Sequence, residues 1–483
     1  MKKKLVFSIL GKFMLIEAAL LLLSSIVSLI YKEMNGAISF WITAAISAVI
    51  GKSLCLLRPK NSELYAKEGL MIIGLVWIFW SLVGALPFYI SREIPRYIDC
   101  FFETVSGFTT TGASILTDIE SMSKGMLFWR SFTHWIGGMG VLVFAMAIMP
   151  LADKNALHLM RAEVPGPAVS KLVPRGMRNA KILYGIYILL CVIEFVMLVC
   201  GGMPVYDSII HTFSTAGTGG FSCKNASIGT YGSPYIEWVI TVFMLLFSLN
   251  FNLFYFLLIK KFSSVWKNSE WKIFIAIVII ATAFLSFDIR GIYPSPGDTI
   301  RTAAFQVAAT ISTTGFCTAD FNLWSGFAKV VIIALMFIGA CAGSTGGGLK
   351  ISRLIILAKN ATRTLRVVWR PNTIHNIKVD GKTIEDDTVR ATSGYFIIYM
   401  AIFSISWLVV SFGPLTFEES LSSVATCLNN VGPGFGSLGP TGNFYQINDI
   451  SKILLSLNML LGRLEIFPIL MLFMPSVWRK KFI

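Results

Sequence analysis

The chain has 483 residues, 55% of them hydrophobic and only 14% charged, and it carries a net charge of +15. Soluble proteins carry about a quarter charged residues, so this composition excludes an ordinary water-soluble protein and indicates one embedded in lipid. The Lys and Arg residues gather in segments between apolar runs, which is the positive-inside pattern of membrane proteins, and we therefore expect no nucleic-acid partner.

Apolar runs of the length that a spanning helix needs, about 20 residues, recur along the chain. We predict an all-α, multi-pass membrane protein with ten spanning helices and both termini in the cytoplasm, where the basic segments concentrate. The start, Lys2–Lys4 and an apolar run, lacks the cleavage site of a signal peptide and is predicted to be a retained helix. The predicted spanning helices lie near residues 5–30, 36–57, 70–90, 126–150, 182–202, 236–260, 272–290, 327–358, 394–412 and 451–476.

A short Thr/Gly-rich pattern occurs four times, each time after a mildly apolar segment. Its glycines 112, 220, 315 and 432 are 108, 95 and 117 residues apart, a period that suits one unit crossing the membrane twice. A single copy would be read as an ordinary turn between helices, but four copies in equivalent positions predict a repeated pore unit. The copies are Thr109–Ala113, Gly217–Phe221, Ser312–Phe316 and Asn429–Pro433.

The segments before these glycines are too short to span a membrane and too apolar to be surface loops, so we predict re-entrant half-helices there. Three of them begin near polar residues that could cap free N–H groups and whose carboxylates suit the positive end of a helix dipole. The half-helices are 97–108, 206–216, 299–311 and 417–428, and the polar residues are Asp207, Ser208, Asp298, Thr299, Glu418 and Glu419.

The glycine loops after the half-helices are the candidate ion site. Non-helical backbone at membrane depth is tolerated where it is buried in protein or lines a wet cavity, and four loops on one axis would do both. Their carbonyl oxygens could replace the water shell of a cation, and glycine accepts the backbone angles required.

The pattern predicts two extra N-terminal helices followed by four pseudo-symmetric repeats, each a helix, a pore half-helix, a filter loop and a second helix, around one ion pore. The segments are 1–69 (N-terminal helices), 70–150 (repeat 1), 151–181 (cytoplasmic linker), 182–262 (repeat 2), 263–271 (cytoplasmic loop), 272–370 (repeat 3), 371–393 (cytoplasmic loop) and 394–483 (repeat 4).

The second helix of repeat 3 is predicted to break, and only in this repeat. As one helix over 327–357 it would run ~46 Å, beyond a bilayer core, and its middle holds four glycines that each disfavour helix by about 1 kcal/mol. An unwound segment at this depth is a candidate gate; the alternative is a small-residue patch for close helix packing. The segment comprises Gly343, Ser344, Thr345, Gly346, Gly347 and Gly348.

Arg463 lies within the last predicted helix, where an ionised group costs several kcal/mol unless it faces water or a partner. It is either a fixed positive charge in the ion pathway or one half of a structural pair, with Glu465 or another carboxylate. Elsewhere, Gly434–Gly439 matches a dinucleotide fingerprint without the required preceding strand, and the histidines lie too far apart for a local metal site. We therefore expect a non-enzyme.

The chain resembles the Trk/Ktr/HKT superfamily of potassium transporters, most closely its bacterial TrkH branch, over essentially its whole length. The motifs that carry the resemblance are Phe128–Arg130, Trp135–Gly140, Thr218–Ser222, Ala342–Lys350 and Gly462–Glu465.

The resemblance implies a potassium selectivity filter, with 343–348 as the gating loop and Arg463 as the pathway arginine facing it. Glycine at position 112 favours potassium over sodium, whereas the fourth loop lacks the threonines of the others. The implied filter residues are Thr110, Thr111, Gly112, Thr218, Gly219, Gly220, Thr313, Thr314, Gly315, Asn430, Val431 and Gly432.

The resemblance also implies a homodimer in the bacterial inner membrane, each subunit with its own pore. A cytosolic regulatory ring of the TrkA type would dock on the basic inner face, and NAD or ATP would bind that partner; K⁺ is the transported ion, with no covalent cofactor. Two alternatives stay open, a sodium or unselective monovalent cation pathway and a non-conducting membrane sensor or scaffold. Channel-like and ion-coupled transport are not distinguished by the sequence.

Overall fold

The computed structural model describes residues 3–57, 66–140, 176–370 and 376–478 and is helical almost throughout. In this part of the chain the strands are β1 (Lys378–Val379) and β2 (Lys382–Thr383), which pair antiparallel as one small hairpin. The predicted all-α class is therefore confirmed.

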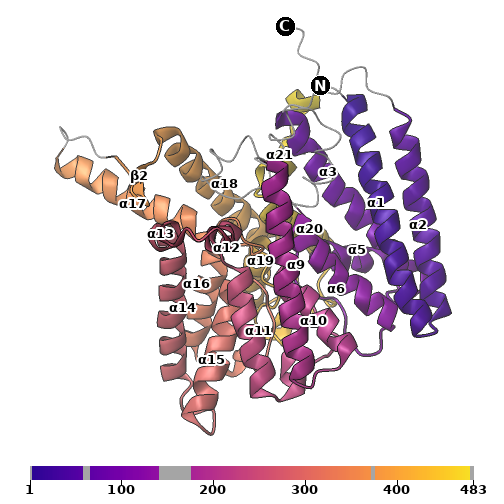
Figure 1. Cartoon of the computed structure of the whole chain (residues 1–483), viewed down its shortest axis with the longest axis horizontal. Helices are drawn as coiled ribbons and strands as arrows, with labels where there is room; N and C mark the ends of the chain where they lie inside the picture. Colours follow the sequence, from indigo (N-terminus) through magenta and orange to yellow (C-terminus); the bar gives the residue numbers. More distant parts are fainter. Residues whose placement is uncertain (1–2, 58–65, 141–175, 371–375, 479–483) are drawn as a thin grey trace.

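The two N-terminal helices, α1 (Lys3–Ile30) and α2 (Met34–Cys55), pack as a hairpin at one flank of the molecule (Figure 1). Small residues let their backbones approach, because a Cβ added to Gly11 would lie 2.6 Å from the carbonyl oxygen of Gly51. Close packing through glycine is typical of membrane helices.

The rest of the described chain follows the predicted order of helix, half-helix, loop and helix. Repeat 1 contains α3 (Ala66–Gly84), α4 (Leu86–Ile90), α5 (Tyr97–Phe108) and α6 (Lys124–Gly138). Repeat 2 contains α9 (Gly176–Cys200), α10 (Val205–Gly217), α11 (Pro234–Phe247) and α12 (Phe251–Leu258). Repeat 3 contains α14 (Ser269–Asp288), α15 (Pro296–Ile311), α16 (Gly326–Ile338) and α17 (Ile351–Trp369). Repeat 4 contains α18 (Asp386–Val410), α19 (Phe417–Asn429), α20 (Asp449–Arg463) and α21 (Phe467–Phe473).

Helix α17 projects beyond the flank formed by α14 (Figure 1). The remaining short elements are α13 (Phe262–Lys267), α22 (Pro475–Trp478) and the 3₁₀ turns η3 (Ser227–Tyr231), η4 (Phe321–Leu323) and η5 (Gly436–Leu438). Most of the predicted linker 151–181 lies outside the described residues.

The half-helix caps differ from the predicted ones. Ser295 caps α15 by accepting the N–H of Asp298 at 3.1 Å, and Thr416 caps α19 in a reciprocal capping box with Glu419. The cap position of α10 is Pro204, and the carboxylate of Asp207 accepts a hydrogen bond from the Tyr231 hydroxyl at 2.8 Å. The predicted acids therefore lie in the first turn, where they still face the positive end of the dipole.

The predicted count of ten spans is not confirmed by the described residues, and the predicted position of the breaks needs correction. Six helices of the described residues are long and apolar enough to cross a membrane, or seven if α11 and α12 count as one span bent by 90°. The prediction of a break in repeat 3 alone is wrong, because repeat 2 bends after Phe247 and repeat 4 breaks between α20 and α21. At that second break Glu465 and Ile466 have φ of 58° and 67°. The later part of the predicted helix 126–150 lies outside the described residues.

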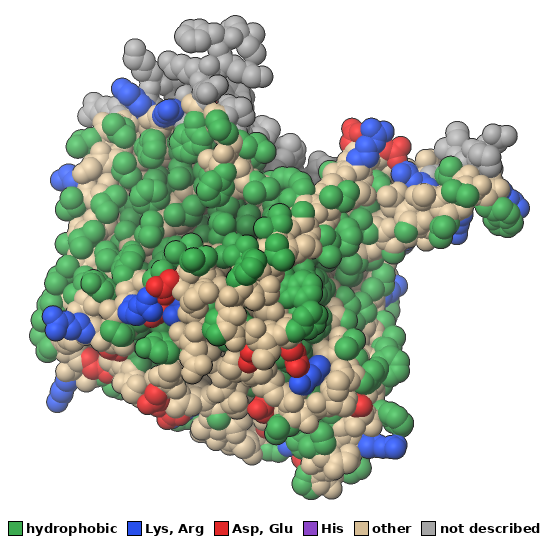
Figure 2. Space-filling model, turned by 180° about the vertical axis from the view of Figure 1, so that it is seen from behind, with side chains coloured by type: hydrophobic (Ala, Val, Ile, Leu, Met, Phe, Trp, Pro, Cys, Tyr) green, Lys and Arg blue, Asp and Glu red, His purple; other side chains and the backbone are tan. Residues whose placement is uncertain are grey.

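The surface fits a lipid environment. Figure 2 shows hydrophobic side chains over a broad area of one face, with the Asp and Glu side chains of that face mostly in its lower part. On α14 the exposed fraction reaches 63% at Ile279 and 68% at Phe287. Such apolar exposure along a whole helix is stable only against lipid or another apolar surface.

Candidate ion-conduction site

The four glycine loops share one backbone conformation. The residues two positions before the glycines, Thr110, Thr218, Thr313 and Asn430, have φ between 53° and 58°, and the glycines have φ between 76° and 116°. A left-handed conformation costs a residue other than glycine about 1–2 kcal/mol, and a β-branched threonine rarely adopts it. Its occurrence in all four loops shows that the surrounding structure imposes it.

A hydrogen bond at the end of each half-helix fixes this turn. The N–H of the residue before each glycine donates to the carbonyl oxygen five residues earlier, at 2.8–3.0 Å. This is the six-to-one bond of a Schellman motif, and it directs the chain out of the helix into the loop. The four pairs are Thr111 with Ser106, Gly219 with Ser214, Thr314 with Ala309 and Val431 with Thr426.

The loops contact one another in a closed ring. A Cβ added to Gly112 would lie 2.0 Å from the Gly219 carbonyl oxygen. A Cβ added to Gly220 would lie equally close, at 2.0 Å, to the carbonyl oxygen of Thr314, and one added to Gly315 to that of Val431. The ring closes because a Cβ on Gly432 would lie 2.9 Å from the carbonyl oxygen of Thr111. Each repeat thus touches the next and the fourth touches the first, and a cavity of about 120 Å³ is lined by all four glycines.

Side chains support the loops in different ways. The hydroxyls of Thr109 and Thr111 lie 2.8 Å apart behind the first loop, and those of Ser312 and Thr314 lie 2.6 Å apart behind the third. The fourth loop has no hydroxyls, as expected, but amides replace them. Asn430 Nδ2 donates to Thr111 Oγ1 and to the Met459 carbonyl, both at 2.9 Å.

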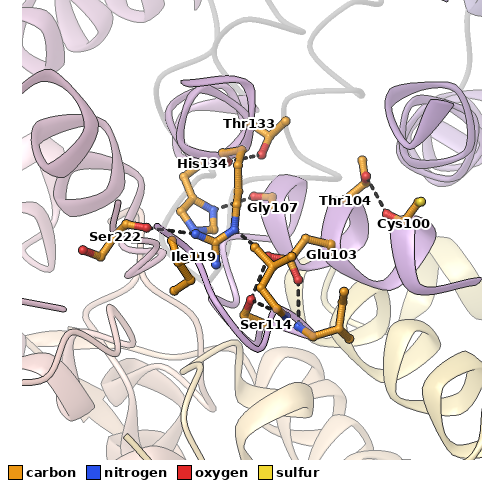
Figure 3. Close-up of polar contacts among 12 residues, drawn as sticks. Cys100, Glu103, Thr104, Gly107, Ser114, Ile119, Thr133, His134 and Ser222 are labelled. Atoms are coloured by element: carbon orange, nitrogen blue, oxygen red, sulfur yellow. Dashed lines mark hydrogen bonds and ion pairs between the residues drawn. The ribbon is translucent and has the colours of Figure 1, made fainter. Parts of the chain in front are cut away.

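A buried ion pair ties the first loop to the second. Arg130 Nε lies 2.5 Å from Glu103 Oε1, with side-chain exposures of 2% and 0%, and Arg130 also donates to the Ser222 carbonyl at 3.0 Å. Glu103 accepts hydrogen bonds from Ser114 Oγ at 3.0 Å and from the N–H of Ile115 at 2.9 Å (Figure 3). Arg130 and Glu103 therefore satisfy each other in the interior, since a buried charge needs such partners.

The glycine-rich segment 343–348 lies next to the third filter loop. The N–H of Gly347 donates to Thr313 Oγ1 at 2.7 Å, and a Cβ on Gly347 would lie 2.4 Å from the carbonyl oxygen of Asn429. On its other side the segment meets the bend of repeat 2, where Thr345 Oγ1 donates to the Phe247 carbonyl at 3.1 Å. The break in repeat 3 and the bend in repeat 2 therefore stabilise each other.

Arg463 faces this segment. Its guanidinium donates to the carbonyl oxygens of Thr345, at 2.5 Å, and of Gly137 and Gly138. Glu465, the predicted alternative partner, instead pairs with Arg353. Arg463 thus joins the glycine-rich segment of repeat 3 to the end of α6 in repeat 1.

Two side chains at the site were not singled out from the sequence. Glu270 accepts hydrogen bonds from the N–H groups of Ala342, at 2.7 Å, and Ser352, at 3.1 Å, and so caps both ends of the break. His134 packs against the second filter loop. An isolated acid or histidine beside an apolar run was the available signal, and it does not reveal a contact with a distant loop.

The chain is similar to known proteins over nearly its whole length. The family model of TrkH, described as a cation transport protein, matches residues 33–480. The chain belongs to the TrkH family. The Trk system potassium uptake protein TrkH of Salmonella typhimurium is 38% identical over 98% of both chains. TrkG of Escherichia coli is 35% identical over 94% of both.

The crystal structure of the potassium transporter TrkH from Vibrio parahaemolyticus is also similar, with a TM-score of 0.88 and 33% identity. The match covers 99% of this chain and 100% of that one. The resemblance inferred from the motifs is thereby confirmed, and this TrkH-family chain is a multi-pass membrane protein.

Proposed function

We propose that this protein takes up K⁺ across the bacterial inner membrane through the ring of the four glycine loops. The observation that carries the proposal is the closed sequence of contacts in which each filter glycine abuts a carbonyl of the next repeat. Backbone carbonyls around one axis can replace the hydration shell of a dehydrated cation. The names of the relatives and the glycine at position 112 favour K⁺ over Na⁺.

Segment 343–348 is the gate in this proposal. It is unwound, lies beside the filter loops of repeats 3 and 4, and is held by hydrogen bonds that a change in the α11–α12 bend would alter. Arg463 is the positive charge of the pathway below the filter, where it shortens the residence of a cation by repulsion. Its three carbonyl contacts keep it there without a salt bridge to Glu465.

The protein works as a homodimer with a cytosolic TrkA-type ring that binds NAD or ATP. The relatives are named as parts of a Trk system, and the basic segments of this chain offer an electrostatic surface for such a partner. Lys359, Arg363, Arg366 and Lys378 line one cavity on this surface, beside the hairpin that packs near the start of α14.

Growth of a potassium-uptake-deficient bacterium tests the proposed cargo. Expression of this chain together with its regulatory partner is expected to restore growth at low external K⁺. Failure to restore growth, with Na⁺ flux intact in the same cells, would favour the sodium or unselective alternative. A matched strain that expresses the chain with Gly315→Asp, which puts a side chain into the ring, is expected to stay deficient.

A further inference from the structure

The second filter loop differs from the first and third. It has Gly217 and Gly219 where those loops have the hydroxyl pairs Thr109–Thr111 and Ser312–Thr314. Neither Gly217 nor Gly219 has a positive φ, so the backbone itself does not require glycine at either position. Another feature of the structure must account for the missing side chains.

The imidazole of His134, on α6, occupies the space behind this loop. A Cβ added to Gly219 would lie 2.4–2.5 Å from the ring atoms Cδ2, Cγ and Nδ1 of His134, and one added to Gly217 would lie 2.2 Å from the His134 carbonyl oxygen. The two glycines leave room for α6 and its ring. His134 thus stands where the first and third loops have their own hydroxyl pair.

The ring of His134 is fixed by two contacts, one of which is itself supported by Arg130. Nδ1 lies 2.7 Å from the carbonyl oxygen of Gly107 (Figure 3), and because a carbonyl only accepts, the proton of this bond is on Nδ1. The ring stacks on Phe221 with centroids 4.1 Å apart, and the Arg130 guanidinium covers the same phenyl ring at 3.5 Å. The side chain of His134 is fully buried, so it has little freedom to move away from Gly219.

We propose that His134 is a positioning residue that determines ion specificity, by setting where the Gly219 carbonyl stands in the filter. This inference rests on the proposed function of the four loops. The Gly219 carbonyl is the one that abuts Gly112, so a shift behind the second loop changes the ring at the contact between repeats 1 and 2. Selection between K⁺ and Na⁺ depends on the number and spacing of such carbonyls.

Ion flux into proteoliposomes tests the proposal, with K⁺ and Na⁺ measured separately for each variant. His134→Ala removes the ring and is expected to lower the K⁺-to-Na⁺ flux ratio about tenfold, which equals about 1.4 kcal/mol. Gly219→Thr alone clashes with the ring and is also expected to lose selectivity. The double variant His134→Ala/Gly219→Thr supplies a side chain like that of the first and third loops and is expected to regain most of the ratio.

The recovery in the double variant is a readout that a purely structural role would not give, since two independent defects would add. His211→Asn is the matched control: His211 is equally buried but bonds to Asp207 O and Ser222 Oγ, and the flux ratio is expected to stay near that of the wild type. If His134→Ala yields no folded protein, His134→Phe, which retains a ring but loses the Nδ1 bond, is measured with the double variant.

An unchanged flux ratio in His134→Ala or its substitute, or a double variant no better than the singles, would overturn the proposal. If the proposed K⁺ uptake itself were wrong, the wild-type protein would show no K⁺-selective flux, which distinguishes that outcome from a failure of the role of His134.

Discussion

Filter glycines in this chain are required by two separate constraints, and the sequence reveals only one of them. The period of Gly112, Gly220, Gly315 and Gly432 predicts loops that need positive φ. It does not predict that each glycine lies against a carbonyl of another repeat, since these contacts join residues that are distant in the sequence. For the same reason Arg463 could be identified as unusual, but its carbonyl partners could not.

The contact constraint predicts the effect of Gly220→Ala. The new methyl group would lie 2.0 Å from the Thr314 carbonyl oxygen, and the alanine would have to adopt a φ of 76°. We therefore expect K⁺ flux in proteoliposomes to fall more than about tenfold. Gly202→Ala is the matched control, because Gly202 has a similar φ of 87° but nothing within 4 Å of an added Cβ. Equal flux in the two variants would mean that backbone strain, and not the ring contact, limits transport.

Neutralising Arg463, which we propose to lie in the ion pathway, is expected to raise the K⁺ flux. Arg463→Gln keeps donors for carbonyl contacts but removes the positive charge, and we expect a higher K⁺ flux because repulsion of the cation is lost. Arg96→Gln removes an arginine that is half exposed and paired with Asp449 and serves as the control. A folded Arg463→Gln protein with wild-type flux would place Arg463 outside the pathway.

At the scale of elements, periodicity predicted the half-helices well because each is a short apolar segment before a Thr/Gly loop. It predicted only one of the three described breaks, since repeat 3 alone has a glycine run. The bend after Phe247 and the break at Leu464–Ile466 contain no run of glycines, and packing contacts hold them. Phe247 accepts hydrogen bonds from Thr345, and Glu465 pairs with Arg353, contacts that no local pattern encodes.

Shortening the glycine-rich segment tests its role as gate. Deletion of Gly346 and Gly347 removes the hydrogen bond to Thr313 Oγ1. We expect higher K⁺ flux with an unchanged K⁺-to-Na⁺ ratio, because the contacts between the four glycine loops are kept. The flux of both ions into proteoliposomes is the measurement. Flux that stays at the wild-type level would favour the alternative, a small-residue patch for helix packing.

Replacing Glu270 is expected to raise the K⁺ flux as well, but less than shortening the glycine-rich segment. Glu270→Ala leaves the N–H groups of Ala342 and Ser352 without their acceptor, so we expect a more mobile segment and increased flux. Hydrogen exchange of 339–352 is expected to increase with it. Glu68→Ala changes another buried acid, on α3, and is expected to leave exchange in this segment unchanged. Faster exchange in Glu68→Ala but not in Glu270→Ala would contradict a capping role of Glu270.

At the scale of the whole molecule, four related units bring their glycine loops into one ring, and the side chains that support the loops differ. Hydroxyl pairs stand behind loops 1 and 3, an imidazole behind loop 2 and amides behind loop 4. The sequence predicted the fourfold arrangement because the repeat is visible in one dimension. The sequence also showed that the fourth loop lacks the threonines. It could not predict the contacts of His134 with loop 2 or of Asn430 with Thr111, because both join different repeats.

We expect the ring of carbonyls to conduct K⁺ in preference to Na⁺. The most direct test is flux of the two ions through purified protein in liposomes under equal gradients, with and without the regulatory partner. We expect K⁺ flux well above Na⁺ flux, increased by the partner and reduced more than about tenfold in Gly220→Ala. Equal passage of both ions, or no flux of either with the partner present, would contradict it.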